Sequence, residues 1–268
     1  MNTKSTYTKL TEDRIDKNEK KDNWEVAIGL NEVDNLKPSK YLIELIKESI
    51  ESKKTYKEIE NILYDYYDKL DINDSILQNK ECDLVCLRIV EVLESGSFKF
   101  SPITLKTIHK YLFKDLSEED KTHSGKFRDY NVSKTEPILG KDTVIYADYN
   151  DLMESLSYDF EEERKSSTKV CISRLAKFAS SIWQIHPFCE KNTITTAVFM
   201  IKYLRSLGYE VNDELFKESS MYFRNALILS NYCDVNKNIK PDFKYLESFF
   251  EKLLIDKDID LEKIEEMN

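Results

Sequence analysis

Side chains that could carry out chemistry gather in one short stretch, HPFCEKN at residues 186–192. His186 ends an apolar segment, Glu190 follows four positions later, and a second apolar segment begins at Asn192 or Thr193. An imidazole is well matched to general-base work near neutral pH, and a carboxylate oxygen is a ligand that magnesium prefers. The first backbone N–H groups of a helix have no acceptor within that helix, so a helix start here would bind an anion. This combination suits transfer of a phosphate-bearing group to a hydroxyl.

The same stretch is also compatible with a plain connection between two helices. A histidine at a helix end and a charged turn are common structural features. Phe188, beside Pro187, would then fill a gap in the core at the junction. The residue types alone leave both interpretations open.

Two apolar helices are predicted to hold this turn in place. SRLAKFASSIWQI at residues 173–185 and TITTAVFMIKYLRSL at 193–207 have apolar residues at the three- and four-residue spacing of a helix. The same spacing predicts further helices at 24–36, 39–50, 55–70, 81–94, 102–116, 151–164, 212–232 and 244–254. The predicted fold class is mainly α.

Local signals refine this pattern. Pro38 ends one helix and Ser39 is a plausible N-cap for the next, while Pro102 suits the first turn of its helix. Between residues 124 and 148 apolar and polar residues alternate on both sides of LGKD at 139–142, which predicts a β-hairpin in an otherwise helical protein.

Composition restricts the class of protein. The 268 residues are 34% charged and 41% hydrophobic with 5 Gly and 5 Pro, which is typical of a soluble, helix-rich globular chain. A net charge of -10 argues against general binding to nucleic acid or to an anionic membrane, because the overall field repels phosphates. No apolar run is long enough to span a membrane.

Five cysteines are present, and no apolar leader precedes Tyr7. An odd number of cysteines without a leader predicts free thiols in a reducing cytoplasm. Cys82 and Cys86 lie one helical turn apart, but no second pair of thiol or imidazole ligands accompanies them. They are therefore predicted to be small buried side chains rather than zinc ligands.

The stretch from His186 resembles the signature of the Fic family, His-x-Phe-x-Asp/Glu-Gly-Asn-Gly/Thr-Arg-x-x-Arg, whose members mostly transfer AMP from ATP to a protein hydroxyl. The matching positions are His186, Phe188, Glu190, Asn192 and Thr193. The segments LVCLRIVEVLESGSFKFSPITLKTIHKYLF, SGKFRDYNVSKTE, VIYAD and YFRNALILSNY also resemble Fic core segments in the expected order. The resemblance covers roughly residues 82–256.

This resemblance implies a Fic-type helical bundle with a small β-hairpin flap near Lys134–Tyr146, which would align a target protein by adding a strand to its edge. It implies His186 as the general base and Glu190 as the magnesium site. The implied nucleotide- and phosphate-binding residues are Lys191, Asn192, Thr193 and Asn225. ATP would be the co-substrate and Mg²⁺ the cofactor. The partner would be a target protein bound through the flap, or another Fic protein.

Three positions depart from the family signature. Lys191 stands where the family has glycine, Ile194 where it has the first arginine, and Ala197 where it has the second. Isoleucine and alanine cannot form the forked, charge-assisted hydrogen bonds that guanidinium groups make to a polyphosphate. Lys191 could compensate in part as a point charge, or could block close approach of the phosphates. The departures predict either an adenylyltransferase with weak or altered activity, or an inactive Fic pseudoenzyme that acts as a binding protein or antitoxin-like regulator.

The N-terminal segments 33–39 and 49–67 resemble the small antitoxin of the VbhA type, which inserts an inhibitory helix carrying Ser/Thr-x-x-x-Glu-Gly/Asn. The aligned residues are Leu30, Asp34 and Asn35, of which Asn35 matches fully. Asp34 and Asn35 are thus the candidate inhibitory residues, although the arginine partner would be Ala197, so the usual ion pair is not expected. Glu60-Asn61 resembles the end of the motif as well, with Glu60 expected on a solvated helix face.

The predicted organisation has four parts. They are a flexible arm at residues 1–23, an antitoxin-like N-terminal helical unit at 24–80, a Fic domain at 81–256 and a C-terminal tail at 257–268.

Overall fold

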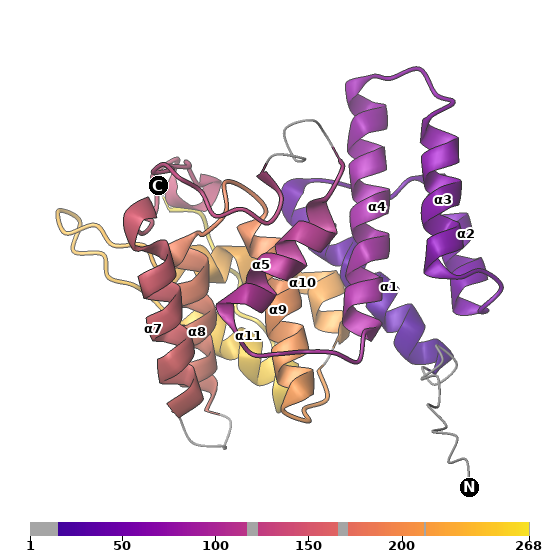
Figure 1. Cartoon of the computed structure of the whole chain (residues 1–268). Helices are drawn as coiled ribbons and strands as arrows, with labels where there is room; N and C mark the ends of the chain where they lie inside the picture. Colours follow the sequence, from indigo (N-terminus) through magenta and orange to yellow (C-terminus); the bar gives the residue numbers. More distant parts are fainter. Residues whose placement is uncertain (1–15, 117–122, 166–170, 212, 268) are drawn as a thin grey trace, which may run out of the picture.

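The computed structural model describes residues 16–116, 123–165, 171–211 and 213–267 (Figure 1). Its α-helices are α1 (Lys17–Asn31), α2 (Lys40–Ile50), α3 (Tyr56–Tyr67), α4 (Asp74–Glu94), α5 (Pro102–Phe113), α7 (Leu152–Lys165), α8 (Ile172–Ile185), α9 (Asn192–Ser206), α10 (Asp213–Leu229) and α11 (Lys244–Leu254). Short 3-10 helices are η2 (Glu32–Asp34), η3 (Pro137–Leu139) and η4 (Tyr149–Asp151). The prediction of a mainly helical fold is confirmed.

Helix starts follow the capping signals of the sequence. The Ser39 hydroxyl accepts a hydrogen bond from the backbone N–H of Leu42, as predicted for an N-cap. Thr55 and Glu58 form a reciprocal capping box at the start of α3. Pro102 occupies the first turn of α5, also as predicted.

The first helix begins earlier than its apolar pattern indicates. Residues 1–15 of the predicted arm lie outside the described part of the chain, but α1 already begins at Lys17. Its first turns are held by polar contacts: Lys20 donates to the Ser52 hydroxyl at 3.0 Å, and the fully buried Asn23 accepts from Arg205 at 2.9 Å. Apolar spacing cannot reveal a helix segment that is fixed through hydrogen bonds.

The helices surround α9, in which every residue from Asn192 to Leu204 is buried. Helices α5 and α8 pack against α9, α7 and α11 pack against α8, and α3 packs against α4. In Figure 1, α2, α3 and α4 stand side by side, and α1 passes from them toward α10. Helix α1 has its largest interfaces with α10 and α4, so it joins the N-terminal helices to the rest of the molecule.

Close contact between α1 and α10 depends on Gly29. A Cβ atom at this position would lie 2.5 Å from the Cα of Lys217 and 2.5 Å from the carbonyl oxygen of Phe216. Only glycine lets the two backbones approach to this distance.

Two buried polar side chains fix the N-terminal helices against α4. Asp83 accepts hydrogen bonds from the Ser39 backbone at 2.8 Å and from the Tyr67 hydroxyl at 2.6 Å, which joins the ends of α2 and α3. Burial raises the pKa of Asp83 above its ordinary value, and these hydrogen bonds oppose that shift. Arg88, also fully buried, donates to the Tyr64 hydroxyl of α3 at 2.9 Å and to the Lys114 carbonyl, beyond the end of α5, at 2.7 Å.

The position predicted for Glu60 is wrong. Glu60 is 8% exposed rather than solvated, with its carboxylate 2.9 Å from the Lys57 ammonium and 3.5 Å from the Arg88 guanidinium. The basic side chains come from α3 itself and from α4, and a pattern on α3 alone does not reveal the second of them.

The prediction of a two-stranded hairpin between Lys134 and Tyr146 is not confirmed. This fully described segment is a turn closed by an isolated antiparallel bridge between Thr135 and Thr143. Pro137 begins η3 and lacks an N–H for a ladder, and Gly140 and Lys141 both have positive φ, at 62° and 73°. Apolar and polar residues do alternate here, but Pro137, Gly140 and Lys141 form the turn, so they cannot extend two paired strands.

C-terminal residues pack on this turn. The Met267 N–H donates to the Ile138 carbonyl at 2.8 Å. A Cβ atom on Gly140 would lie 2.7 Å from the Met267 carbonyl oxygen. The segment predicted as a tail therefore touches the body of the molecule, at least up to Met267.

Among the described helices, none combines the length and apolar character needed to cross a membrane. Cys82 and Cys86 are fully buried, which confirms their predicted burial.

Candidate active site

The end of α8 places His186 at the start of the loop. His186 is the C-cap of this helix and adopts the left-handed conformation, with φ 51° and ψ 57°. Arg128 closes the helix end: its Nε donates to the His186 carbonyl at 2.7 Å, and its Nη2 donates to the Ile185 carbonyl at 3.2 Å. The Arg128 backbone N–H also donates to the Pro187 carbonyl at 2.9 Å. Arg128 thus satisfies carbonyl groups that a helix end leaves without partners.

The His186 imidazole is buried and neutral. It is 4% exposed, with its ring centroid 4.0 Å from that of Tyr146 and 5.8 Å from that of Trp183. Neither ring nitrogen has a partner in hydrogen-bond geometry among the described residues. Burial lowers the pKa of His186 to about 3, and the positive charge of Lys134 lowers it further, whereas the nearby Trp183 carbonyl raises it. The ring therefore keeps an unprotonated nitrogen at neutral pH, underneath Tyr146.

Asn192 holds the loop in shape. Its side-chain oxygen accepts from the Phe188 N–H at 3.1 Å, and its Nδ2 donates to the Phe188 carbonyl at 2.8 Å and the Glu190 carbonyl at 3.4 Å. Both ends of the amide are used inside the loop. In this conformation the Asn192 side chain fixes the loop backbone. Any anion at this place would bind the N–H groups at the start of α9 instead.

His109 supports the loop from α5. The Gly125 N–H donates to its Nδ1 at 2.9 Å, so that nitrogen carries no proton, and Nε2 faces the Glu190 carbonyl at 3.4 Å. The ring stacks on Phe188 with centroids 3.8 Å apart. Burial lowers the pKa of His109 to about 4. The hydrogen bond to the Glu190 carbonyl has the opposite, smaller effect on this pKa. The sequence carried a signal for this residue, because His109 lies four positions after Leu105 on the apolar face of its predicted helix.

Lys191 turns away into an ion-pair cluster. It is the N-cap of α9, with φ 61°, a conformation that favours glycine. Its ammonium lies 3.0 Å from the Asp34 carboxylate and 2.5 Å from the Glu81 carboxylate. Burial alone would lower the pKa of Lys191, but these two carboxylates raise it well above its usual range. Asp34, the candidate inhibitory residue, thus reaches the loop through Lys191 and not through position 197.

The positions where the family signature has arginine lie in the core. Ile194 and Ala197 are both fully buried on α9. Thr193 is 9% exposed, and its hydroxyl accepts from the Trp183 indole N–H at 2.9 Å. The hydroxyl of Thr193 therefore fixes α9 to α8.

Glu190 is exposed at a cavity of about 320 Å³ that His109, His123 and Lys191 also line. Within the described ranges, no group of three or more His, Cys, Asp or Glu side chains is arranged to hold a metal ion. Glu190 alone fits magnesium only if phosphate oxygens and water supply the remaining ligands, which is how this ion is commonly held.

Two predicted residues make no hydrogen bond to the loop. Asn225 is half-buried on α10 and makes no hydrogen bond to another described residue. Asn35 is exposed at the left-handed turn that ends η2, where its N–H donates to the Glu32 carbonyl at 2.9 Å.

The turn that carries Tyr146 is anchored on α10. Glu136 is 1% exposed, lies 2.6 Å from the Arg224 guanidinium and accepts from the Tyr146 hydroxyl at 3.5 Å. Sequence reasoning identified neither Glu136 nor Arg224. Each is one charged residue among many, and the contact spans 88 positions of the chain.

Comparison with known proteins relates this arrangement to one family. Residues 99–204 match the model of the Fic/DOC family. The chain also matches the crystal structure of the N-terminal FIC domain of Bep8, a VirB-translocated Bartonella effector protein from Bartonella sp. 1-1C. The TM-score is 0.55 at 21% identity, with 71% of this chain and 91% of that chain covered, so the likeness shows the fold. No curated protein matches the chain.

Domains of the Fic family generally transfer AMP or other nucleotidyl groups onto proteins, and generally use ATP and Mg²⁺. The loop from His186 to Asn192 lies inside the matched segment of the Fic domain, as do Arg128 and His109. Asp34 and Glu81 lie outside it. The resemblance of the N-terminal helices to a VbhA-type antitoxin is not confirmed by these comparisons, and the predicted domain limits stay a prediction.

Proposed function

We propose that the Fic domain is a protein adenylyltransferase whose loop is restrained by the N-terminal helices. The observation that carries this proposal is the neutral, unpartnered imidazole of His186 at the end of α8, directly before a loop that Asn192 and His109 hold in shape. When Tyr146 moves away and water reaches the ring, the lowered pKa of His186 should rise toward its ordinary value. The imidazole can then take the proton of a target hydroxyl as that oxygen attacks the α-phosphate of ATP. The new O–P bond replaces the bond to the leaving pyrophosphate.

The phosphates would bind at the start of α9. The N-cap residue of α9 makes no side-chain capping bond, so the first N–H groups of the helix are available to an anion. Magnesium, when bound by Glu190 together with phosphate oxygens, would neutralise part of the phosphate charge. The loop residues orient the phosphates, and His186 handles the proton.

Two contacts oppose this reaction in the described conformation. Tyr146 covers the His186 ring, so the segment Lys134–Tyr146 must move before a target hydroxyl reaches it. That segment would then serve as the flap, with a target strand pairing along its edge. The ion-pair cluster of Lys191, Asp34 and Glu81 holds the ammonium away from any phosphate.

The test uses purified full-length protein with Mg²⁺ and ATP labelled at either the α- or the γ-phosphate. Label from the α-phosphate should appear on this protein or on a lysate protein, and label from the γ-phosphate should not. The variant His186→Asn should abolish labelling, because asparagine cannot act as the base. Equal labelling by wild type and His186→Asn would exclude the proposed mechanism.

A second function is favoured by Ile194 and Ala197, because neither side chain can hold a polyphosphate as an arginine at these positions of the family signature would. In this alternative the chain is an inactive Fic protein that binds another protein, such as an active Fic protein that it restrains. Calorimetry separates the two: the alternative requires no ATP binding in the presence of Mg²⁺ together with a stable protein complex.

A further inference from the structure

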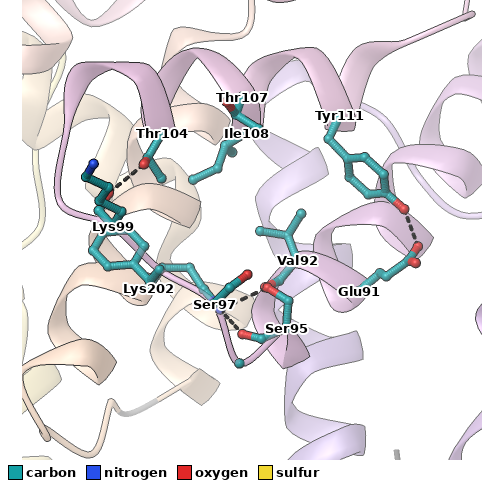
Figure 2. Close-up of a pocket in the computed structure, with 12 residues that line it drawn as sticks. Glu91, Val92, Ser95, Ser97, Lys99, Thr104, Thr107, Ile108, Tyr111 and Lys202 are labelled. Atoms are coloured by element: carbon teal, nitrogen blue, oxygen red, sulfur yellow. Dashed lines mark hydrogen bonds between the residues drawn. The ribbon is translucent and has the colours of Figure 1, made fainter. Parts of the chain in front are cut away.

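A larger cavity, of about 700 Å³, lies where α4, α5 and α9 meet (Figure 2). It shares no lining residue with the cavity at Glu190. Part of its wall is apolar, with Val92 and Phe98 half-buried and Ile108 buried. The size suits a small organic molecule.

One buried cation lies in this cavity. Lys202 is 6% exposed on α9, and Figure 2 shows its side chain reaching the backbone at Ser95. Its ammonium donates to the Ser95 carbonyl and to the Ser95 hydroxyl, the latter at 3.2 Å. An ammonium has three N–H groups, so one remains for a further acceptor.

Lys202 has no carboxylate partner among the described residues. Glu91 lines the same cavity, but Figure 2 shows it bonded to the Tyr111 hydroxyl at some distance from the Lys202 amine. Burial lowers the pKa of Lys202 to about 8, and the nearby Arg205 charge adds to the effect. A buried charge without a counter-ion is costly, whereas a bound anion would offset that cost.

Charge selects the kind of anion. The charged side chains that line the cavity are the buried Lys202, the exposed Lys99 and Glu91, which together carry a formal charge of +1. This charge matches a ligand with a single negative charge and disfavours ligands that carry several. The half-buried Val92 and Phe98 provide contacts for an apolar body, and the Thr104 and Thr107 hydroxyls lie along α5 at the rim. These features together describe a ligand with one carboxylate and a hydrophobic remainder.

We infer that the Lys202 cavity is a binding site for a small carboxylate with an apolar body, with the carboxylate on the Lys202 ammonium. This inference is independent of the proposed transferase activity, because it concerns different residues and a different ligand. The same chemistry is offered by a free organic acid and by the C-terminal carboxylate of a peptide.

Calorimetry on the full chain at pH 7 tests the inference with two probes. These are 4-phenylbutyrate and a short peptide that ends in leucine with a free carboxylate, each compared with its neutral amide. At least one acid should bind, and its amide should bind at least tenfold more weakly. Tighter binding of the butyrate would assign the site to free acids, and tighter binding of the peptide would assign it to protein C-termini.

Variants locate the binding. Lys202→Met keeps the aliphatic stem and should weaken binding at least tenfold, whereas Lys47→Met, on the exposed face of α2, should leave it unchanged. Ser97→Trp should also reduce binding by filling the cavity from its exposed loop. Binding of the wild type should weaken as the pH rises above about 8, where Lys202 loses its proton. No binding by either acid, equal binding of acid and amide, or full affinity in both Lys202→Met and Ser97→Trp would overturn the inference.

Discussion

At the scale of single residues, Asn192 uses both ends of its amide to fix the loop that follows His186. We expect Asn192→Ala to lower the free energy of unfolding by about 2 kcal/mol, because it removes buried hydrogen bonds worth roughly 0.5–1.5 kcal/mol each. Urea unfolding measures this. The exposed Asn236 is the matched control, and Asn236→Ala should change the free energy by less than about 0.5 kcal/mol. Similar losses in both variants would mean that the Asn192 bonds do not stabilise the loop.

The neutral His109 predicts a pH dependence. Its pKa is about 4 in the folded protein and about 6.5 when unfolded, so the unfolded state binds more protons between these values. The contribution of His109 to stability is therefore complete above about pH 6.5 and falls as the pH is lowered toward 4. By pH 5 the loss amounts to about 2 kcal/mol.

The variant His109→Gln isolates this contribution, because an amide can donate and accept but does not titrate in this range. Urea unfolding at pH 7 and pH 5 should show a smaller loss of stability on acidification in His109→Gln than in the wild type. Buried carboxylates such as Asp83 contribute equally to the pH dependence of the unfolding free energy in both proteins. Their contribution therefore cancels when the change between pH 7 and pH 5 is compared. An identical slope in both proteins would show that His109 is not neutral and buried.

At the scale of the elements, Gly29 lets the backbones of α1 and α10 approach each other closely. Gly29→Ala would place a methyl group 2.5 Å from the α10 backbone, so the helices must separate. We expect a loss of about 1–3 kcal/mol, which is typical of overpacking. Gly96→Ala is the control, because nothing lies within 4 Å of a Cβ atom there. Urea unfolding of both variants should separate them clearly, and equal stability would contradict the described packing.

Helices that are stabilised by apolar packing were easier to predict from the sequence than elements that are held by polar contacts or turn residues. Helices with a clear apolar stripe, such as α2 and α11, could be located from sequence within a residue or two. The start of α1 could not, because Lys20 and Asn23 are held through polar contacts with residues far along the chain. The hairpin failed for the opposite reason: the alternation was present, but Pro137 and two positive φ values left room for a single bridge in that segment.

The site was predictable only in part. The spacing of His186, Glu190 and Asn192 placed them in one loop between two helices, as α8 and α9 have it. The partners of Lys191 were not foreseeable, since Asp34 is 157 positions away and reaches the loop only because α1 packs on α10 and α4. The same holds for Arg128, whose function depends on the carbonyl groups that surround it.

At the scale of the whole molecule, two residues outside the matched Fic segment contact the loop. Asp34 follows α1, Glu81 belongs to α4, and together they hold Lys191. We therefore propose that the N-terminal helices lower the transferase activity of the loop by holding Lys191. This proposal does not depend on their resemblance to an antitoxin.

We propose that the loop is a transferase site and that the Lys191 ion-pair cluster restrains it. The most direct measurement is incorporation of α-labelled AMP by wild type, by Asp34→Asn with Glu81→Gln, and by that double variant with His186→Asn added. The double variant leaves Lys191 in place but removes both of its charged partners, so Lys191 can contact phosphate. We predict at least tenfold more labelling than in wild type, and none once His186 is replaced. Labelling no greater than in wild type, or unchanged by His186→Asn, would contradict the account.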